Sequence, residues 1–152
     1  MGLVHIYCGD GKGKTSAAVG LAVRAAGCGK RVVIARFLKT DNSGEVEILK
    51  KIPEVTLIPC RKTFGFVRSM DEETKRECAA YHRELFGEAV KLAEHADLVV
   101  FDEIMAAVNY GMVPECDVLE FLENRPGRDQ TDGLEIVLTG RDPSEKLIAA
   151  AD

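Results

Sequence analysis

The chain has 152 residues, of which 46% are hydrophobic and 30% are charged, and its formal net charge is −5. This composition is typical of one globular domain and excludes a disordered or low-complexity chain. The acidic balance argues against a nucleic-acid-binding protein, which needs a clustered basic surface. No apolar stretch approaches the ~20 residues that cross a bilayer, so we expect no membrane partner.

The cysteines and the start of the chain predict a cytoplasmic protein. Five cysteines are scattered along the sequence, and no two of them form a Cys-x-x-Cys pair. An odd number without regular spacing is typical of reduced thiols. The first apolar run begins at residue 3, which leaves no room for a signal peptide. His5, His82 and His95 are too dispersed to predict a zinc site.

A glycine-rich segment follows the first apolar run. Leu3 to Tyr7 has the residue content of a buried strand, and residues 16–26 have the apolar density of a packed helix. Between them, residues 8–15 read Cys-Gly-Asp-Gly-Lys-Gly-Lys-Thr. Such a turn leaves backbone N–H groups free to converge on an anion at the positive end of the helix dipole. It predicts a phosphate-binding loop, the alternative being a turn without a ligand.

Two residues at the end of this loop carry its expected chemistry. The Lys14 ammonium can reach a terminal phosphate, and the Thr15 hydroxyl can ligate Mg²⁺. The strict pattern begins with glycine where this chain has Cys8, so the entrance to the loop is altered. The residues expected to contact the nucleotide are Gly9, Asp10, Gly11, Lys12, Gly13, Lys14, Thr15 and Ser16.

Further apolar runs alternate with helical patterns along the rest of the chain. Strands are expected at residues 31–38, 55–59, 98–101 and 134–139, and helices at 45–52, 71–96, 114–124 and 143–151. Asp71 is the expected N-cap of the longest helix. Residues 60–70 form the one long connection without a predicted element. The alternation predicts an α/β protein with an open, mostly parallel sheet, helices on both faces and ligands beyond the carboxyl ends of the strands.

Charged residues follow two of the predicted strands at that edge. Asp102 and Glu103 come directly after the apolar strand at 98–101, where they can hold Mg²⁺ directly or through water. The alternative is a pair of acids that stabilise the dipole of a following helix. Arg141 follows the last strand and either pairs with phosphate or lies in a surface turn. Arg24, nine residues after Thr15, either reaches back to the nucleotide or is solvated.

The long connection contains two aromatic residues two positions apart, Phe64 and Phe66. In an extended segment both rings would point to one face, which suits a flat apolar substrate. The alternative is that one or both rings anchor the connection to the core.

Taken in order, these blocks resemble the P-loop ATP:corrinoid adenosyltransferases, also called cob(I)yrinic acid a,c-diamide adenosyltransferases. The resemblance covers nearly the whole chain. Its blocks are residues 9–15, 20–27, 29–32, 37–39, 102–104, 109–111, 124–126 and 138–141. A non-glycine residue at the first position of the loop is a habit of this family. The resemblance implies a three-layer P-loop NTPase-like (RecA-like) fold.

The resemblance also implies an enzyme with a defined reaction. Cobalt(I) of a reduced corrinoid, cob(I)alamin or cob(I)yrinic acid a,c-diamide, attacks the 5′ carbon of ATP, and triphosphate leaves. Lys14 and Glu103 take the catalytic positions; Thr15 and Glu103, supported by Asp102, hold Mg²⁺ or Mn²⁺. Arg24 falls at a nucleotide contact, and we assign Arg141 to ATP as well. Phe64 and Phe66 stand where the family has a Phe-x-aromatic pair, commonly Phe-Thr-Trp, on the corrinoid side.

The resemblance also has implications for the partners of the protein and for the length of the chain. A homodimer is expected, and a flavin-type protein is the expected electron donor. Family members continue past a Leu-Ile-x-x-Ala-Asp stretch into another strand and a tail, whereas this sequence ends at Asp152. We therefore expect a single nucleotide-binding domain over residues 1–152 that lacks that strand and tail. Two alternatives are a Mg²⁺-dependent NTPase that acts on a protein partner and a nucleotide-binding module without turnover.

Overall fold

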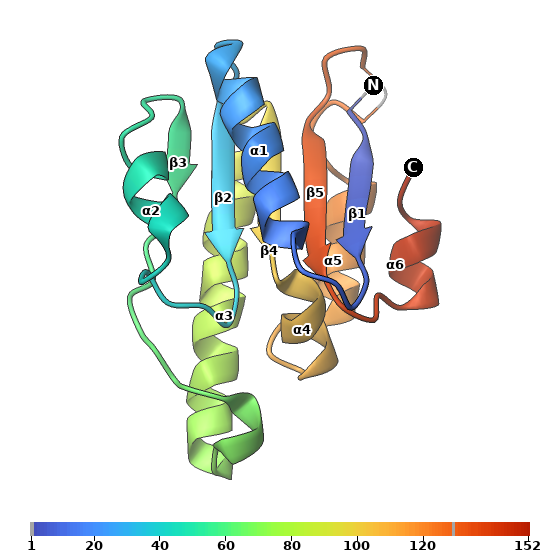
Figure 1. Ribbon diagram of the computed structural model, residues 1–152. Coiled ribbons are helices and arrows are strands. Elements are labelled where there is room, and N and C mark those ends of the chain that lie inside the picture. The colour runs from blue at the N-terminus through green and yellow to red at the C-terminus, as the bar shows by residue number, and fades with distance from the viewer. Residues whose placement is uncertain (1, 129) are drawn as a thin grey trace.

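A parallel five-stranded sheet forms the centre of the computed structural model, which describes residues 2–128 and 130–152 (Figure 1). The strands are β1 (Val4–Cys8), β2 (Val32–Arg36), β3 (Val55–Leu57), β4 (Leu98–Asp102) and β5 (Glu135–Gly140). They are ordered β1-β5-β4-β2-β3, and every neighbouring pair is parallel. The carboxyl ends of all strands therefore meet at one edge, the lower edge in Figure 1.

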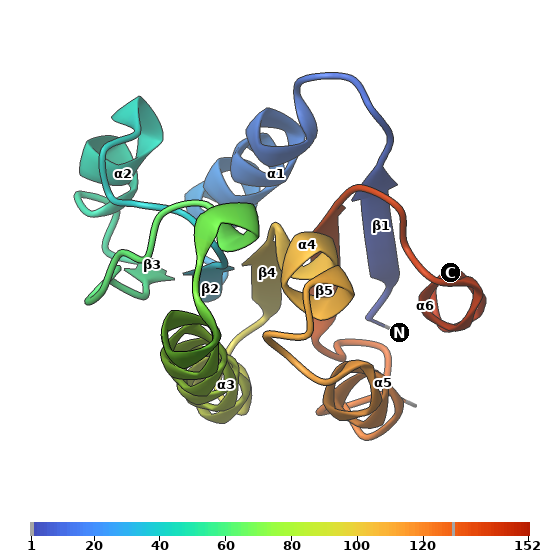
Figure 2. The same ribbon diagram turned by 90° about the horizontal axis from the view of Figure 1, so that it is seen from below.

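Helices cover both faces of this sheet (Figure 2). The helices α1 (Lys14–Gly27) and α2 (Gly44–Leu49) lie on one face, whereas α3 (Glu72–Ala93), α4 (Ile104–Asn109) and α5 (Glu115–Glu123) lie on the other. A short helix, α6 (Glu145–Ala149), lies beside the edge strand β1. The predicted α/β class with an open parallel sheet is thus confirmed.

Successive side chains of the central strands point to opposite faces of the sheet, so the core has two layers. In β2, Val32 and Ile34 pack with α1, whereas Val33 and Ala35 pack with the residues of α3. Every residue of β2 and β4 is buried, as expected of strands covered on both faces. The small residues Ala18, Ala22 and Ala26, which are four apart in α1, are the buried ones. Their size lets α1 pack closely against this face of the sheet.

The boundaries of several elements differ from those predicted. The strand expected at residues 31–38 ends at Arg36, and the helix expected at 71–96 ends at Ala93, although Asp71 caps it as predicted by accepting from the Thr74 N–H (2.8 Å). The helix α4 was not predicted, because six residues are too few to show a helical period. A 3₁₀ turn at Val67–Ser69 lies inside the long connection.

Among residues 2–128 and 130–152, three non-glycine residues adopt left-handed backbone conformations, and each follows a strand at the carboxyl edge. They are Leu38 (φ 53°) after β2, Glu103 (φ 62°) after β4 and Asp142 (φ 50°) after β5. Such conformations cost about 1–3 kcal/mol each and persist where the surrounding structure imposes them. Their common location marks this edge as the functional one. Among the described residues, no helix is both long and apolar enough to cross a membrane.

Candidate functional site

The phosphate loop connects β1 to α1 at the carboxyl edge of the sheet. Gly9 (φ 120°) and Gly13 (φ 109°) take backbone conformations that a side chain would strain. The Lys14 ammonium lies over the loop, where it donates to the carbonyl oxygens of Gly9 (2.6 Å) and Gly11 (2.7 Å). The N–H groups of the first turn of α1 have no partner within the helix. The loop therefore presents one cation and several backbone donors to an anion.

Asp102, at the end of β4, is the hub of the site. Its side chain is 3% exposed, and its Oδ1 accepts from the hydroxyls of Thr15 (2.9 Å) and Thr139 (2.7 Å). Its Oδ2 accepts from the Lys39 ammonium. The carboxylate thus joins the ends of β2, β4 and β5 to the start of α1. The structure brings Thr15 and Asp102 together as the sequence predicted.

Two residues of this hub were not predicted as site residues. Thr139 is fully buried in β5, donates to Asp102 and accepts from the backbone N–H of Glu103 (2.9 Å). Lys39 donates to Thr15 Oγ1 (2.8 Å) as well as to Asp102. Both lie in blocks of the family resemblance, residues 138–141 and 37–39, and this is the main sequence signal for them. Beyond it, Thr139 is a polar residue at the end of an otherwise apolar strand, and Lys39 follows a strand.

The donor set around Asp102 suits a hard cation. Hydroxyl and carboxylate oxygens are the ligands that Mg²⁺ takes in proteins, and it completes its shell with phosphate oxygens and water. The Lys39 ammonium, in contact with both Thr15 and Asp102, shows that the two oxygens converge on one cation. No cluster of three or more His, Cys, Asp or Glu side chains with metal-binding geometry occurs within residues 2–128 and 130–152. The oxygens of a bound nucleotide would therefore have to complete the metal shell.

Glu103 precedes α4 and lines a cavity beside the hub. Its left-handed backbone is fixed by the hydrogen bond from its N–H to Thr139. The cavity, here called the Phe66 cavity, has a volume of 630 Å³ and is lined by Lys39, Phe66, Arg68, Glu103 and Tyr110 among others. Glu103 therefore lies between the hub and this cavity.

The two predicted arginines differ in their positions. Arg141 donates to the carbonyl oxygen of Asp10 (3.1 Å), so it lies against the phosphate loop. Arg24 is exposed in the second half of α1, about 14 Å along the helix axis from Thr15. The structure therefore brings Arg141 to the loop, and the nucleotide contacts of both arginines stay predictions.

The aromatic connection is held against α3 by its first half. Arg61 forms a two-pronged ion pair with Glu88 (2.5 and 2.9 Å), and this pair lowers the pKa of the Glu88 carboxyl. Lys62 pairs with Glu77 (2.7 Å). The Phe64 ring packs against Tyr81, with centroids 5.7 Å apart. These contacts fix the connection as far as residue 64.

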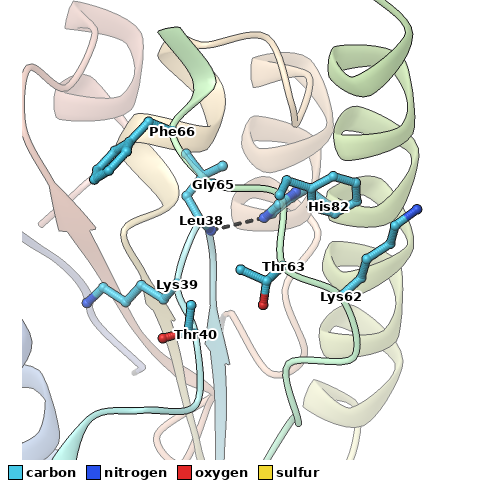
Figure 3. Close-up of a pocket in the computed structure, with 9 residues that line it drawn as sticks. Leu38, Lys39, Thr40, Lys62, Thr63, Gly65, Phe66 and His82 are labelled. Atoms are coloured by element: carbon cyan, nitrogen blue, oxygen red, sulfur yellow. Dashed lines mark hydrogen bonds between the residues drawn. The ribbon is translucent and has the colours of Figure 1, made fainter. Parts of the chain in front are cut away.

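Phe66 is directed away from this anchor. The segment is not extended, because Gly65 has a φ of 78°, so the two rings do not share a face. Phe64 is half-buried, whereas Phe66 is 87% exposed. In Figure 3 the Phe66 ring points away from α3. Of the two interpretations of the pair, anchoring therefore applies to Phe64, and Phe66 remains available to a ligand.

His82 of α3 supports the connection between β2 and Lys39 (Figure 3). Its Nε2 accepts from the backbone N–H of Leu38 (2.9 Å), so the ring proton is on Nδ1, which donates to the Cys78 carbonyl (2.8 Å). Burial lowers the pKa of the His82 imidazole, because the charged form loses its hydration. A neutral His82 thus holds Leu38 in its left-handed conformation.

This arrangement predicts acid sensitivity. The pKa of His82 is lower in the folded chain than in the unfolded one, so below about pH 6.5 the unfolded state binds more protons. The unfolding free energy therefore decreases as the pH is lowered through this range. We expect His82→Gln, which keeps an acceptor but does not titrate, to show a smaller loss of unfolding free energy between pH 7.5 and 5.5. Urea denaturation at both pH values measures this, and identical losses in the two proteins would contradict it.

Comparison with known proteins places the chain in a family. Residues 1–152 match the family described as ATP:corrinoid adenosyltransferase BtuR/CobO/CobP. The chain belongs to the ATP:corrinoid adenosyltransferase family. It is 32% identical over 154 residues to the corrinoid adenosyltransferase of Escherichia coli K12, covering 99% of this chain and 74% of that protein. It is 33% identical to the corrinoid adenosyltransferase CobA of Salmonella typhimurium LT2, with the same coverage of each chain.

Membership of this adenosyltransferase family confirms the resemblance seen in the sequence. A corrinoid adenosyltransferase of Pseudomonas aeruginosa is also similar, at 29% identity over 99% of this chain and 72% of that protein. The family reading is therefore favoured over the NTPase alternative. In this adenosyltransferase, the phosphate loop and the Phe66 cavity open at the same edge of the sheet, with Lys39 and Glu103 between them.

Proposed function

We propose that the protein transfers the 5′-deoxyadenosyl group of ATP to the cobalt of a reduced corrinoid and releases triphosphate. The observation that carries this proposal is the junction of two unlike compartments. A cationic, donor-rich loop suits a polyphosphate, and the adjoining Phe66 cavity suits an apolar face. Lys39 and Glu103 line the boundary where the reacting carbon of ATP would lie.

The reaction is a displacement at a primary carbon. Cobalt(I) supplies an electron pair to the 5′ carbon, a carbon–cobalt bond forms, and the carbon–oxygen bond breaks with its electron pair leaving on triphosphate. Such a step needs an aligned nucleophile and a leaving group whose charge is neutralised. We assign the neutralisation of the leaving group to Lys14, which lies over the loop, and to the N–H groups of residues 9–15. We assign the alignment of the nucleophile to the cavity wall around Phe66.

Mg²⁺ or Mn²⁺ is the proposed metal. The resemblance assigns it to Thr15 and Glu103 with Asp102 in support. However, Thr15 Oγ1 and Asp102 Oδ2 both contact the Lys39 ammonium. We therefore propose these two residues as its ligands, with Glu103 nearby. When bound, it would supply further neutralisation of the leaving phosphate charge. Thr139 would position Asp102 through the hydrogen bond to Oδ1. The role of Arg141 is to close the far side of the loop, where it already contacts Asp10.

The corrinoid is proposed to bind in the Phe66 cavity. Cob(I)alamin and cob(I)yrinic acid a,c-diamide are both candidate substrates, since each offers a flat macrocycle to an exposed ring. Arg68, in the same cavity wall, suits the amide or carboxylate groups at a corrinoid rim. A flavin-type electron donor, a homodimer and a cytoplasmic location stay predictions.

Phe66 and Phe64 are expected to respond differently to replacement by alanine. Phe66→Ala should impair the corrinoid step while ATP affinity and unfolding free energy stay within about 0.5 kcal/mol of the original, because the ring is exposed. Phe64→Ala should lower the unfolding free energy by about 1–2 kcal/mol, because its ring packs on Tyr81. Corrinoid KM, ATP affinity and urea denaturation distinguish the two. If Phe64→Ala raised the corrinoid KM and Phe66→Ala left it unchanged, Phe64 would be the corrinoid contact and Phe66 would not.

The products separate this function from its alternatives. With ATP and a chemically reduced corrinoid, we expect triphosphate and a light-sensitive corrinoid product in equal amounts. An NTPase would instead release inorganic phosphate without any corrinoid. Binding of ATP with neither product would favour a nucleotide-binding module. Phosphate analysis by ³¹P NMR, with and without the corrinoid, gives all three answers.

A further inference from the structure

Lys39 occupies an unusual position between the two compartments. It follows Leu38 directly, and its side chain, 26% exposed, reaches the hub formed by Thr15 and Asp102. It also lines the Phe66 cavity and a second cavity of 260 Å³, here called the His82 cavity, whose lining residues are drawn in Figure 3. It is thus the cation that touches both proposed metal ligands.

A divalent cation and this ammonium cannot share the two oxygens. Both would contact Asp102 Oδ2 and Thr15 Oγ1. Two cations bound to the same pair of oxygens lie close together, and they repel strongly beside a buried carboxylate. Asp102 is almost fully buried, so it cannot turn to offer another oxygen, and its Oδ1 is already committed to Thr15 and Thr139. Metal binding therefore requires the Lys39 ammonium to leave.

The surroundings give the ammonium somewhere to go. The Lys39 stem is flexible and unbranched. Its backbone is held by the preceding residue, whose N–H is bound to His82 (2.9 Å). The side chain can therefore swing while its origin stays fixed. Lys39 lines the Phe66 cavity and also contacts Thr15 at the end of the phosphate loop (2.8 Å), so both regions are within its reach. An ammonium that faces a polyphosphate forms a charge-assisted hydrogen bond with its oxygens.

We propose that Lys39 is the resident cation of the metal site, which a divalent metal displaces so that the ammonium then pairs with the polyphosphate. The proposal rests on the proposed function, since it takes Thr15 and Asp102 as the metal ligands. The ammonium keeps the buried carboxylate paired and its ligand geometry in place before metal arrives. Lys39 is therefore a positioning residue for the metal ligands. It also favours nucleotide that carries a metal over metal-free nucleotide, because the metal releases the Lys39 ammonium to the polyphosphate.

The test titrates the protein with Mn²⁺ alone and follows free Mn²⁺ by electron paramagnetic resonance. Lys39→Met should bind Mn²⁺ at least about 10-fold more tightly than the original protein, because the competing charge is gone. Lys62→Met is the matched control. Lys62 also lines the His82 cavity, but it pairs with Glu77 and lies over the Phe64 ring (4.9 Å), so its loss should leave Mn²⁺ affinity unchanged.

A second titration uses ATP at saturating Mn²⁺. Lys39→Met should bind ATP about 10-fold to 100-fold more weakly, because one charge-assisted contact to the polyphosphate is lost. Lys39→Gln provides a second neutral variant in case methionine beside Asp102 prevents folding, and it should show the same two changes. Equal Mn²⁺ affinity in the original protein and in either folded variant would overturn the proposal.

A third variant separates failure of this inference from failure of the proposed metal site. Asp102→Asn should lose affinity for Mn²⁺ in the presence of ATP. If it does so while Lys39→Met gains no affinity for Mn²⁺, the metal site stands and the role of Lys39 is wrong. If Asp102→Asn binds Mn²⁺ with ATP as well as the original protein, the metal ligands themselves are wrong.

Discussion

Replacing Lys14 with alanine is expected to abolish turnover, with a loss of at least about 100-fold in the adenosyl-transfer rate. The Lys14 ammonium lies within 2.7 Å of two loop carbonyls, so it is held at the centre of the loop where the phosphate charge must gather. Without it, the leaving triphosphate loses the side-chain cation that lies over the loop itself, and the proposed metal, Lys39 and Arg141 act only from its margins. ATP binding by calorimetry and single-turnover kinetics measure the loss.

A lysine away from the loop provides the control for Lys14. Lys51→Ala removes the same charge from an exposed position just after α2 and should leave both ATP affinity and rate unchanged. Turnover of Lys14→Ala at the original rate would exclude residues 9–15 as the phosphate site.

The second large effect is expected for Asp102→Asn. This change removes the negative charge that Lys39, Thr15 and Thr139 surround, so metal-dependent turnover should be lost. It also leaves the Lys39 ammonium without its partner, which should lower the unfolding free energy by about 2 kcal/mol. Activity measured against metal concentration and urea denaturation report the two effects separately.

A double mutant tests the origin of that instability. Combining Asp102→Asn with Lys39→Met removes both charges, so part of the lost unfolding free energy should return. Asp132→Asn, at an exposed position in the turn between α5 and β5, should change neither activity nor stability. Additive losses in the double mutant would show that the two side chains act independently.

The strands and the phosphate loop were predictable because their signals are local. Residues 9–15 form a contiguous loop, and the carboxylates of Asp102 and Glu103 follow an apolar strand directly. Parallel strands bring such positions to one edge without any knowledge of side-chain contacts. The sheet order, by contrast, depends on which strands pair, and neighbours such as β1 and β5 are more than a hundred residues apart.

The rest of the site depends on contacts between residues distant in sequence. Lys39 meets Asp102 across 63 residues, and His82 holds Leu38 across 44. No local pattern distinguishes such a lysine or histidine from a surface or core residue. The geometry of the aromatic pair was also hidden, because it depends on the left-handed conformation of Gly65. A glycine permits that conformation but does not require it.

The fate of the 5′ carbon of ATP tests the central claim most directly. The experiment incubates the protein with ATP carrying ¹³C at that carbon and with a reduced corrinoid, and follows the label by NMR in the dark. We predict that the labelled carbon becomes bonded to cobalt while unlabelled triphosphate accumulates. A label that remains attached to oxygen in adenosine phosphates, with inorganic phosphate released, would contradict adenosyl transfer.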